Sequence, residues 1–120
     1  MSQIDTFEAM LGRGQDSDML RFTLGSAYYK EKRFTEAIVH LTRAVEQNPT
    51  YSTAWKVLGR VFADDGQFQE ALRAFQSGLL AARKNGDKQV EKEIGVFQKR
   101  AQKQLDAIDQ SNAQQQPPVL

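Results

Sequence analysis

Apolar residues recur at helical spacing along most of the chain and predict six helices. The first is a short amphipathic helix over residues 2–11. The others cover about 18–31, 34–47, 52–65, 68–84 and 87–109. Each has an apolar stripe on one face and polar residues elsewhere, which is typical of helices that pack on one side. Asn48-Pro49, Asp65-Gly66 and Asn85-Gly86 are turn sequences between them. The expected fold class is therefore all-α.

The apolar pattern repeats after 34 residues. A repeat of this length is typical of one helical hairpin, which cannot bury its apolar face alone, so that consecutive hairpins must stack. The aligned residues agree in size and polarity: Leu24 with Leu58, Gly25 with Gly59, Tyr28 with Phe62, Phe34 with Phe68, and Glu36-Ala37 with Glu70-Ala71.

Two complete repeats and two partial ones account for most of the chain. We expect residues 18–51 to form the first repeat and residues 52–85 the second. Residues 1–17 would supply a capping helix and a loop, and residues 86–109 a long C-terminal capping helix, because the end repeats of such stacks are atypical. From residue 110 the sequence is mainly Ser, Asn, Gln and Pro, so residues 110–120 are predicted to be a disordered tail.

Three glycines occupy the middle of predicted helices. Gly25 and Gly59 align at the 34-residue period, and Gly95 joins them when the last helix is shifted by 36 residues. Glycine inside a helix costs about 1 kcal/mol relative to alanine. We therefore expect another helix to pass close to each of the three.

These residues resemble the signature of the tetratricopeptide repeat (TPR) family, which runs W-x2-L-G-x2-Y, then A-x3-F, then P. The second repeat supplies Trp55, Leu58, Gly59, Phe62, Ala71 and Phe75, and the first supplies Leu24, Gly25, Tyr28, Ala37, Leu41, Ala44 and Pro49. Arg21 replaces the tryptophan of the first repeat, and Arg83 replaces the closing proline of the second. The resemblance covers residues 18–85 and looks like a small stand-alone bacterial TPR protein. It implies antiparallel helix-turn-helix repeats, a TPR-like α-solenoid, with Trp55 in the core and a peptide-binding groove.

Composition excludes several other classes of protein. The net charge is +1, so no strong field attracts the chain to nucleic acid or to a membrane surface. The absence of cysteine excludes a disulfide framework and a thiol nucleophile. No basic segment precedes an apolar run at the N-terminus, and the longest run, Leu79-Leu80-Ala81-Ala82, is far below the roughly 20 residues of a membrane span. We expect a cytoplasmic protein.

No residue pattern points to catalysis or to a metal. His40 is the only histidine, and the chain offers no cysteine to join it as a ligand. Gly12-Arg13-Gly14 lacks the Gly-Lys-Ser/Thr of a phosphate loop and fits a helix stop. The acidic pairs Asp64-Asp65 and Asp16-Ser17-Asp18 lack the calcium-loop pattern, and turns and helix caps account for them. We therefore predict a protein that is not an enzyme and has no cofactor.

The resemblance places the binding surface on the first helix of each hairpin, on the face that escapes the core. Phe22 and Tyr29 would form an apolar wall, and lysines and arginines would favour an acidic segment. Asp64, Glu93 and Arg100 lie on the same faces. Ser26 and Val57 stand where the chaperone-tail clamp of the family has asparagine, so we do not expect chaperone-tail binding. A solvated charged face with no binding role is the alternative. The predicted groove residues are Met19, Phe22, Ser26, Tyr29, Lys30, Lys56, Val57, Arg60, Lys92, Val96 and Lys99.

The resulting hypothesis is a non-enzymatic protein–protein interaction module that binds a peptide segment of another protein. The alternative is structural self-association, a homodimer formed through the C-terminal helix, residues 90–108, and the open face of the repeats. A third class, nucleic-acid binding by a related helical repeat, is disfavoured by the 34-residue period and the mixed-sign surface. No membrane partner is expected.

Overall fold

The computed structural model describes residues 2–115, which contain six α-helices and, within that range, no strand. The helices are α1 (Gln3–Gly12), α2 (Asp18–Lys30), α3 (Phe34–Gln47), α4 (Ser52–Asp64), α5 (Phe68–Asn85) and α6 (Lys88–Gln115). The all-α prediction is therefore confirmed. In the part of the chain that the structure describes, no helix combines the length and the apolar character needed to cross a bilayer.

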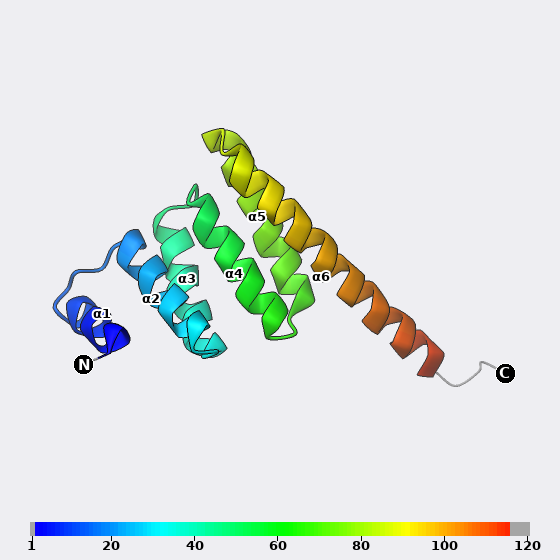
Figure 1. The fold of residues 1–120 in the computed structure, drawn as a ribbon, viewed down its shortest axis with the longest axis horizontal. Coiled ribbons are helices and arrows are strands. Elements are labelled where there is room, and N and C mark those ends of the chain that lie inside the picture. Colours follow the sequence, from blue (N-terminus) through cyan, green and yellow to red (C-terminus); the bar gives the residue numbers. More distant parts are fainter. Residues whose placement is uncertain (1, 116–120) are drawn as a thin grey trace.

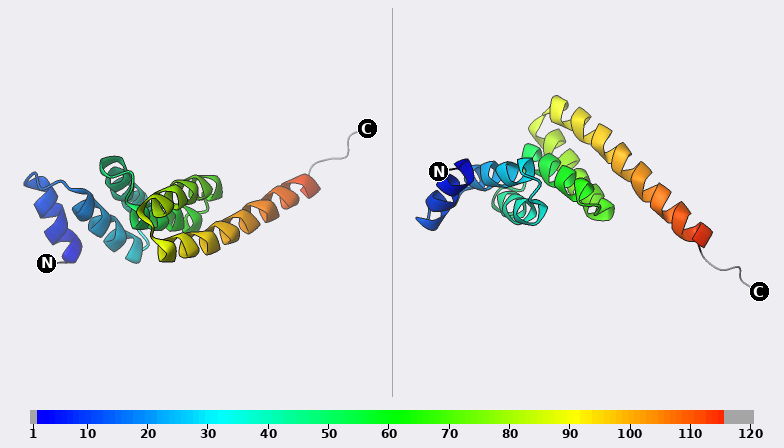
Figure 2. Two further views of the ribbon diagram at one scale, coloured as in Figure 1. Left: turned by 90° about the horizontal axis from the view of Figure 1, so that it is seen from above. Right: turned by 60° about the horizontal axis from the view of Figure 1, so that its bottom comes forward.

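The helices form an elongated stack in two layers. α2 packs against α3, and α4 packs against α5. α1 contacts α2 at one end, and α6 contacts both α5 and α4 at the other. Figures 1 and 2 show α2, α4 and α6 in one layer and α3 and α5 behind them. The molecule measures 63 × 34 × 19 Å, because helical hairpins add along one axis instead of closing around a centre.

Local sequence explains where several helices begin and end. The Ser17 hydroxyl accepts a hydrogen bond from the Leu20 amide (3.1 Å) and caps α2. Asp87 accepts one from the Val90 amide (3.2 Å) at the start of α6. Gly86 ends α5 with φ +70°, a left-handed conformation that glycine adopts without strain. These caps fix the connections that the turn sequences predict.

The core confirms two of the three glycine expectations. A Cβ on Gly25 would lie 2.6 Å from Cγ of Leu41 in α3, and one on Gly59 would meet the Phe75 ring in α5. In each repeat the glycine faces the second helix of its own hairpin. The prediction for Gly95 is wrong, since a Cβ there has open space around it. No helix follows α6 within the described residues, so none crosses this position.

α6 is longer than the periodicity predicts. It continues to Gln115, so the predicted disordered tail is wrong for residues 110–115, and residues 116–120 lie outside the described range. Ala and Gln have good helix propensity and the segment up to Gln115 contains no proline, so the helix continues although residues 110–113 are exposed. Figures 1 and 2 show this half of α6 projecting beyond the stack.

Candidate functional site

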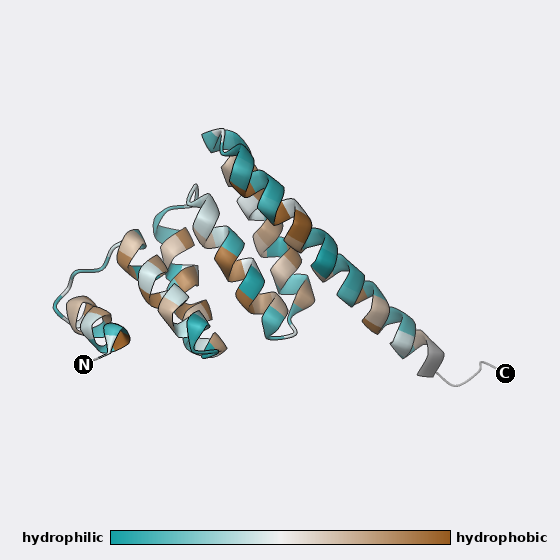
Figure 3. Cartoon of the chain, viewed as in Figure 1, coloured by the Kyte–Doolittle hydropathy of each residue, from teal (hydrophilic) through white to brown (hydrophobic). Residues whose placement is uncertain are grey.

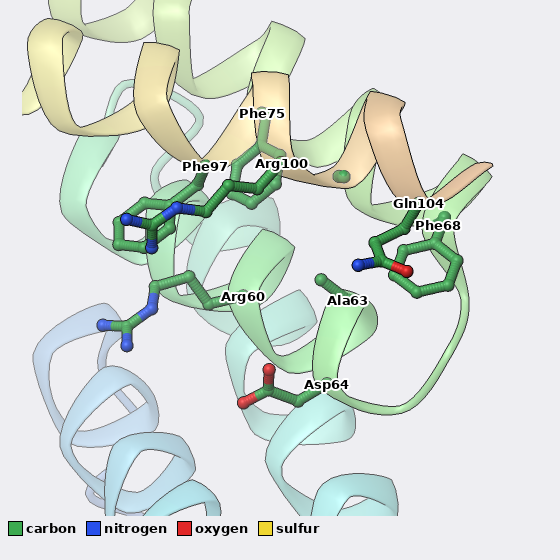
Figure 4. A pocket seen from close by; sticks show the side chains of 9 residues that line it. Arg60, Ala63, Asp64, Phe68, Phe75, Phe97, Arg100 and Gln104 are labelled. Carbon is green, nitrogen blue, oxygen red and sulfur yellow. The ribbon is translucent and has the colours of Figure 1, made fainter. Parts of the chain in front are cut away.

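Two neighbouring hollows lie on the groove face, which we define as the surface made by α2, α4 and α6 on the side away from α3. The α4–α6 hollow, about 450 Å³, lies among α4, α5 and α6 (Figure 4). The α2–α4 hollow, about 520 Å³, lies between α2 and α4 and reaches Lys32 and Phe34, the first residue of α3. Arg60 and Asp64 of α4 line both hollows. The middle helix therefore joins them into one groove.

Arginine side chains stacked on aromatic rings form the centre of this groove. The Arg60 guanidinium carbon lies 4.6 Å from the centre of the Phe97 ring and 5.8 Å from that of the Tyr29 ring. The Arg100 guanidinium carbon lies 5.7 Å from the same Phe97 ring. Figure 4 shows Arg60 and Arg100 approaching Phe97 from α4 and α6. Such stacking attracts the cation to the ring face and limits its motion.

A hydrogen bond between Tyr29 and Asp64 connects α2 to α4 across the groove. The Tyr29 hydroxyl donates to Oδ2 of Asp64 at 2.5 Å. Burial and the adjacent carboxylate raise the pKa of Tyr29 to about 12, so its hydroxyl keeps its proton at neutral pH. The bond also occupies Asp64, which is the carboxylate one turn from Arg60 on α4.

Four of the predicted residues surround the α2–α4 hollow: Ser26, Tyr29, Lys30 and Arg60. Lys30 is exposed at the rim. The Ser26 hydroxyl is buried and has no hydrogen-bond partner among the described residues. This half of the groove therefore contains the residue types expected from sequence, with one polar atom left unsatisfied.

Four other predicted residues lie on these helices but not in the hollows. Lys56 forms an ion pair with Glu93 of α6 (3.3 Å), and its side chain is only 14% exposed. Phe22 packs on Tyr51 with ring centres 5.1 Å apart, and Val57 packs against the core. Met19 is 69% exposed near the start of α2. Lys56 and Phe22 therefore hold the helices together, and only Met19 is freely accessible.

The predicted residues of α6 are not brought to the groove. Lys92 lines a surface hollow with Leu79 and Arg83, and Lys99 lines another with Leu72 and Arg73 of α5. Val96 is 49% exposed and lines neither hollow of the groove. Their assignment to the groove used the 36-residue shift that aligns Gly95 with Gly59.

On α6, the row of residues that faces the groove, which we call the groove row, lies one residue later in the sequence than the 36-residue shift predicts. Phe97, Arg100 and Gln104 line the α4–α6 hollow, and Glu93 pairs with Lys56. One residue is about 100° of helix rotation, enough to exchange the groove side for the outer side. Phe97 also belongs to the apolar stripe of the helix predicted over residues 87–109, and neither Phe97 nor Gln104 is among the predicted groove residues. The spacing of 93, 97, 100 and 104 is the signal that could have found this row.

A second polar cluster lies at the opposite end, where α1 meets α2 and α3. Nε2 of His40 lies 3.3 Å from a Glu8 carboxylate oxygen, and Nδ1 lies 3.1 Å from an Arg21 nitrogen. The Tyr28 hydroxyl donates to the same Glu8 oxygen at 2.7 Å, and its ring stacks on His40. Burial is the main cause that lowers the pKa of His40. A neutral imidazole that accepts from Arg21 and donates to Glu8 fits this geometry.

Comparisons with known proteins establish the family. The sequence pattern described as "Tetratricopeptide repeat" matches residues 28–90. A "TPR repeat-containing protein" of Pseudomonas aeruginosa is 44% identical over 94 residues, which are 78% of this chain and 90% of the relative. The chain therefore belongs to the tetratricopeptide repeat family, as the sequence resemblance predicted. Proteins of this family are generally non-enzymatic protein-interaction modules.

Solved structures agree with this assignment. A protein of Bordetella parapertussis, known from its solution structure, is 41% identical, has a TM-score of 0.78, and the match covers 92% of this chain and 96% of that one. The TPR2B domain of yeast Sti1, solved as a complex with pHsp70, has a TM-score of 0.78 at 18% identity, with 84% and 81% of the two chains covered. At that identity the second similarity concerns the fold alone.

Proposed function

We propose that the groove face binds an extended or helical segment of another protein, and that this segment contains an acidic residue. The observation that carries the proposal is the pair of hollows joined at Arg60, with aromatic side chains in their walls and two arginines at their centre. A surface made by packed helices is preorganised, so the groove itself loses little conformational entropy on binding.

Aromatic and charged groups would have different tasks in this groove. Tyr29, Phe68 and Phe97 offer partly exposed rings, which are the usual anchors of binding energy. An exposed ion pair contributes about 0–1 kcal/mol, so the cations would mainly orient the segment and speed its approach. Lys30 and Met19 at the rim are free to contact the ends of a longer segment.

A matched pair of tryptophan variants tests the location of the groove. Phage-displayed random peptides are selected on the full chain, and their binding is measured against Gln104→Trp and Gln102→Trp. Gln104 lines the α4–α6 hollow, whereas Gln102 lies on the same helix beside α5 residues. We expect Gln104→Trp to abolish binding and Gln102→Trp to retain it. Equal binding to both variants would place the peptide site elsewhere.

Self-association through α6 is the second candidate function. Ile108 is 42% exposed near the half-buried Leu105, and both lie close to the turn between α4 and α5. In Figure 3 the side of α6 that faces the viewer is mainly hydrophilic with separate hydrophobic patches. A second copy would have to cover these patches. Sedimentation equilibrium decides: a monomer at high micromolar concentration contradicts the homodimer.

A further inference from the structure

We infer that the α4–α6 hollow binds a partner carboxylate between Arg60 and Arg100, and that an apolar side chain next to this carboxylate packs against the aromatic floor. The inference rests on the proposed function and narrows the partner to a segment in which one Asp or Glu adjoins an apolar residue. Three observations support it: Arg60 and Arg100 have no carboxylate partner among residues 2–115, aromatic side chains line the hollow, and Asp64 lies at its rim.

In the described part of the chain, Arg60 and Arg100 differ from most arginines in having no carboxylate within ion-pair distance. Five others each pair with a carboxylate: Arg21 with Asp16, Arg33 with Glu36, Arg43 with Glu46, Arg73 with Glu70, and Arg83 with Glu91. Over residues 2–115 no such pair involves Arg60 or Arg100. Asp64 is near enough along α4 to serve Arg60, but it accepts the Tyr29 hydroxyl instead. The charge-assisted donors of both guanidinium groups therefore remain available.

Both guanidinium carbons lie over aromatic rings, chiefly that of Phe97. An arginine that lies over a ring can keep its N–H groups for hydrogen bonds, and a carboxylate accepts two such bonds side by side. Two cations that share one ring repel each other, and an anion between them removes that repulsion. The arrangement is complementary to a planar anion.

The floor and the rim select among anions. Phe68, Phe97 and Ala63 line the hollow and are only partly buried, so they offer apolar surface to a neighbouring side chain. Asp64 lies on the rim of the same hollow. A phosphoryl dianion would be repelled by Asp64 more strongly than a single carboxylate would. A monocarboxylate with an apolar neighbour therefore fits better than a phosphate group.

A titration with small molecules tests the subsite directly. 4-Methylpentanoate combines a carboxylate with an apolar tail, 4-methylpentanamide is its neutral counterpart, and inorganic phosphate lacks the tail. We expect the carboxylate to shift the arginine Nε–H NMR signals of Arg60 and Arg100 and to leave Arg43, on α3, unchanged. The amide should have no effect, and phosphate a weaker one. Equal shifts at Arg43, or stronger shifts with phosphate, overturn the inference.

Peptide affinities separate failure of the inference from failure of the proposed function. Arg60→Gln with Arg100→Gln should weaken a selected acidic peptide roughly tenfold or more. Arg43→Gln with Lys99→Gln removes the same charge elsewhere and should leave affinity within about twofold. Replacing the peptide's Asp or Glu by its amide should weaken binding to the wild type and not to the arginine variant. Suppose that a peptide no longer binds Gln104→Trp but binds the double arginine variant normally. That result overturns the carboxylate inference and leaves the proposed function standing. If no peptide binds, the proposed function fails and the small-molecule titration alone decides the subsite.

Discussion

At the scale of single residues, the packing opposite each helical glycine determines what a methyl group would do. In Gly59→Ala the new Cβ would meet the fully buried Phe75 ring. We expect this overpacking to lower the free energy of unfolding by about 1–3 kcal/mol. Gly95→Ala meets nothing and reduces the entropy of the unfolded chain, so it should raise that free energy by about 0.5–1 kcal/mol. Urea denaturation of both variants is the measurement, and midpoint shifts of the same sign would refute the packing assignment.

His40 gives the protein a residue-scale response to pH. Burial among Tyr28, Glu8 and Arg21 lowers the pKa of His40 below its usual value of 6.5. The unfolded chain therefore takes up this proton at a higher pH than the folded chain does. Below about pH 6.5 the unfolded state binds more protons, so the free energy of unfolding falls as pH decreases, until the folded pKa is passed.

The matching variant is His40→Gln, which cannot take up a proton. His40 is the only histidine, so it dominates titration between about pH 5.5 and 7.5. We expect wild-type stability from urea denaturation to decrease over this interval as the pH is lowered, and that of His40→Gln to be flatter. Parallel pH profiles for the two proteins would show that His40 does not respond as its burial implies.

At the scale of elements, α6 has a packed half and a free half. Ile94 and Ala101 are buried against α4 and α5, whereas residues 110–113 are exposed. A chain that ends after Asp109 should keep its melting temperature. A chain that ends before Val90 would expose the Phe75 surface of α5 and should aggregate or melt at lower temperature. Circular dichroism and light scattering of both chains test this, and normal folding of the shorter one would contradict the capping role of α6.

The elements themselves were largely predictable from sequence, because a 34-residue period fixes both helix spacing and the hairpin partner of each helix. Gly25 and Gly59 mark the close contacts for the same reason. α6 lies outside that period. The packing of Gly95 and the groove row were inferred from an alignment with α4 that is one residue off, whereas the end of the helix was inferred from the change of composition at residue 110. Within residues 2–115, no second hairpin helix packs on the 28-residue α6 to fix its rotation.

Half of the candidate site was less predictable because it depends on pairings between distant residues. Lys56 and Glu93 are 37 positions apart, and Tyr29 and Asp64 are 35 apart. Helical periodicity indicates which face a side chain occupies, but not which partner it meets on the next helix. Lys56 looked like a free cation and is paired, whereas Arg100, on the same predicted face, lacks an ion-pair partner in the described part of the chain.

At the scale of the whole molecule, the small net charge conceals an uneven distribution. Between residues 71 and 105, eight Lys and Arg side chains stand against three Asp and Glu side chains, although the chain as a whole is only +1. These residues form most of α5 and the first part of α6. Lys92 and Lys99 lie on the outer side of α6, away from the two hollows. The segment of α5 and α6 beside the α4–α6 hollow therefore has a local excess of positive charge, although Asp64, Asp65, Glu70 and Asp106 lie just outside it.

This asymmetry leads to a kinetic prediction that separates attraction over distance from contact in the groove. Lys92→Gln with Lys99→Gln weakens the field but touches nothing in the α4–α6 hollow, so it should slow association of an acidic peptide roughly two- to fivefold and leave dissociation unchanged. Arg60→Gln with Arg100→Gln should slow association similarly and also speed dissociation, because contacts are lost. Stopped-flow measurements at low and high salt provide the test. The slower association of the lysine variant should vanish at about 1 M salt, where the Debye length is about 3 Å. The faster dissociation of the arginine variant should persist at that salt concentration. If the lysine variant dissociates faster, the outer side of α6 belongs to the binding surface and the groove assigned here is incomplete.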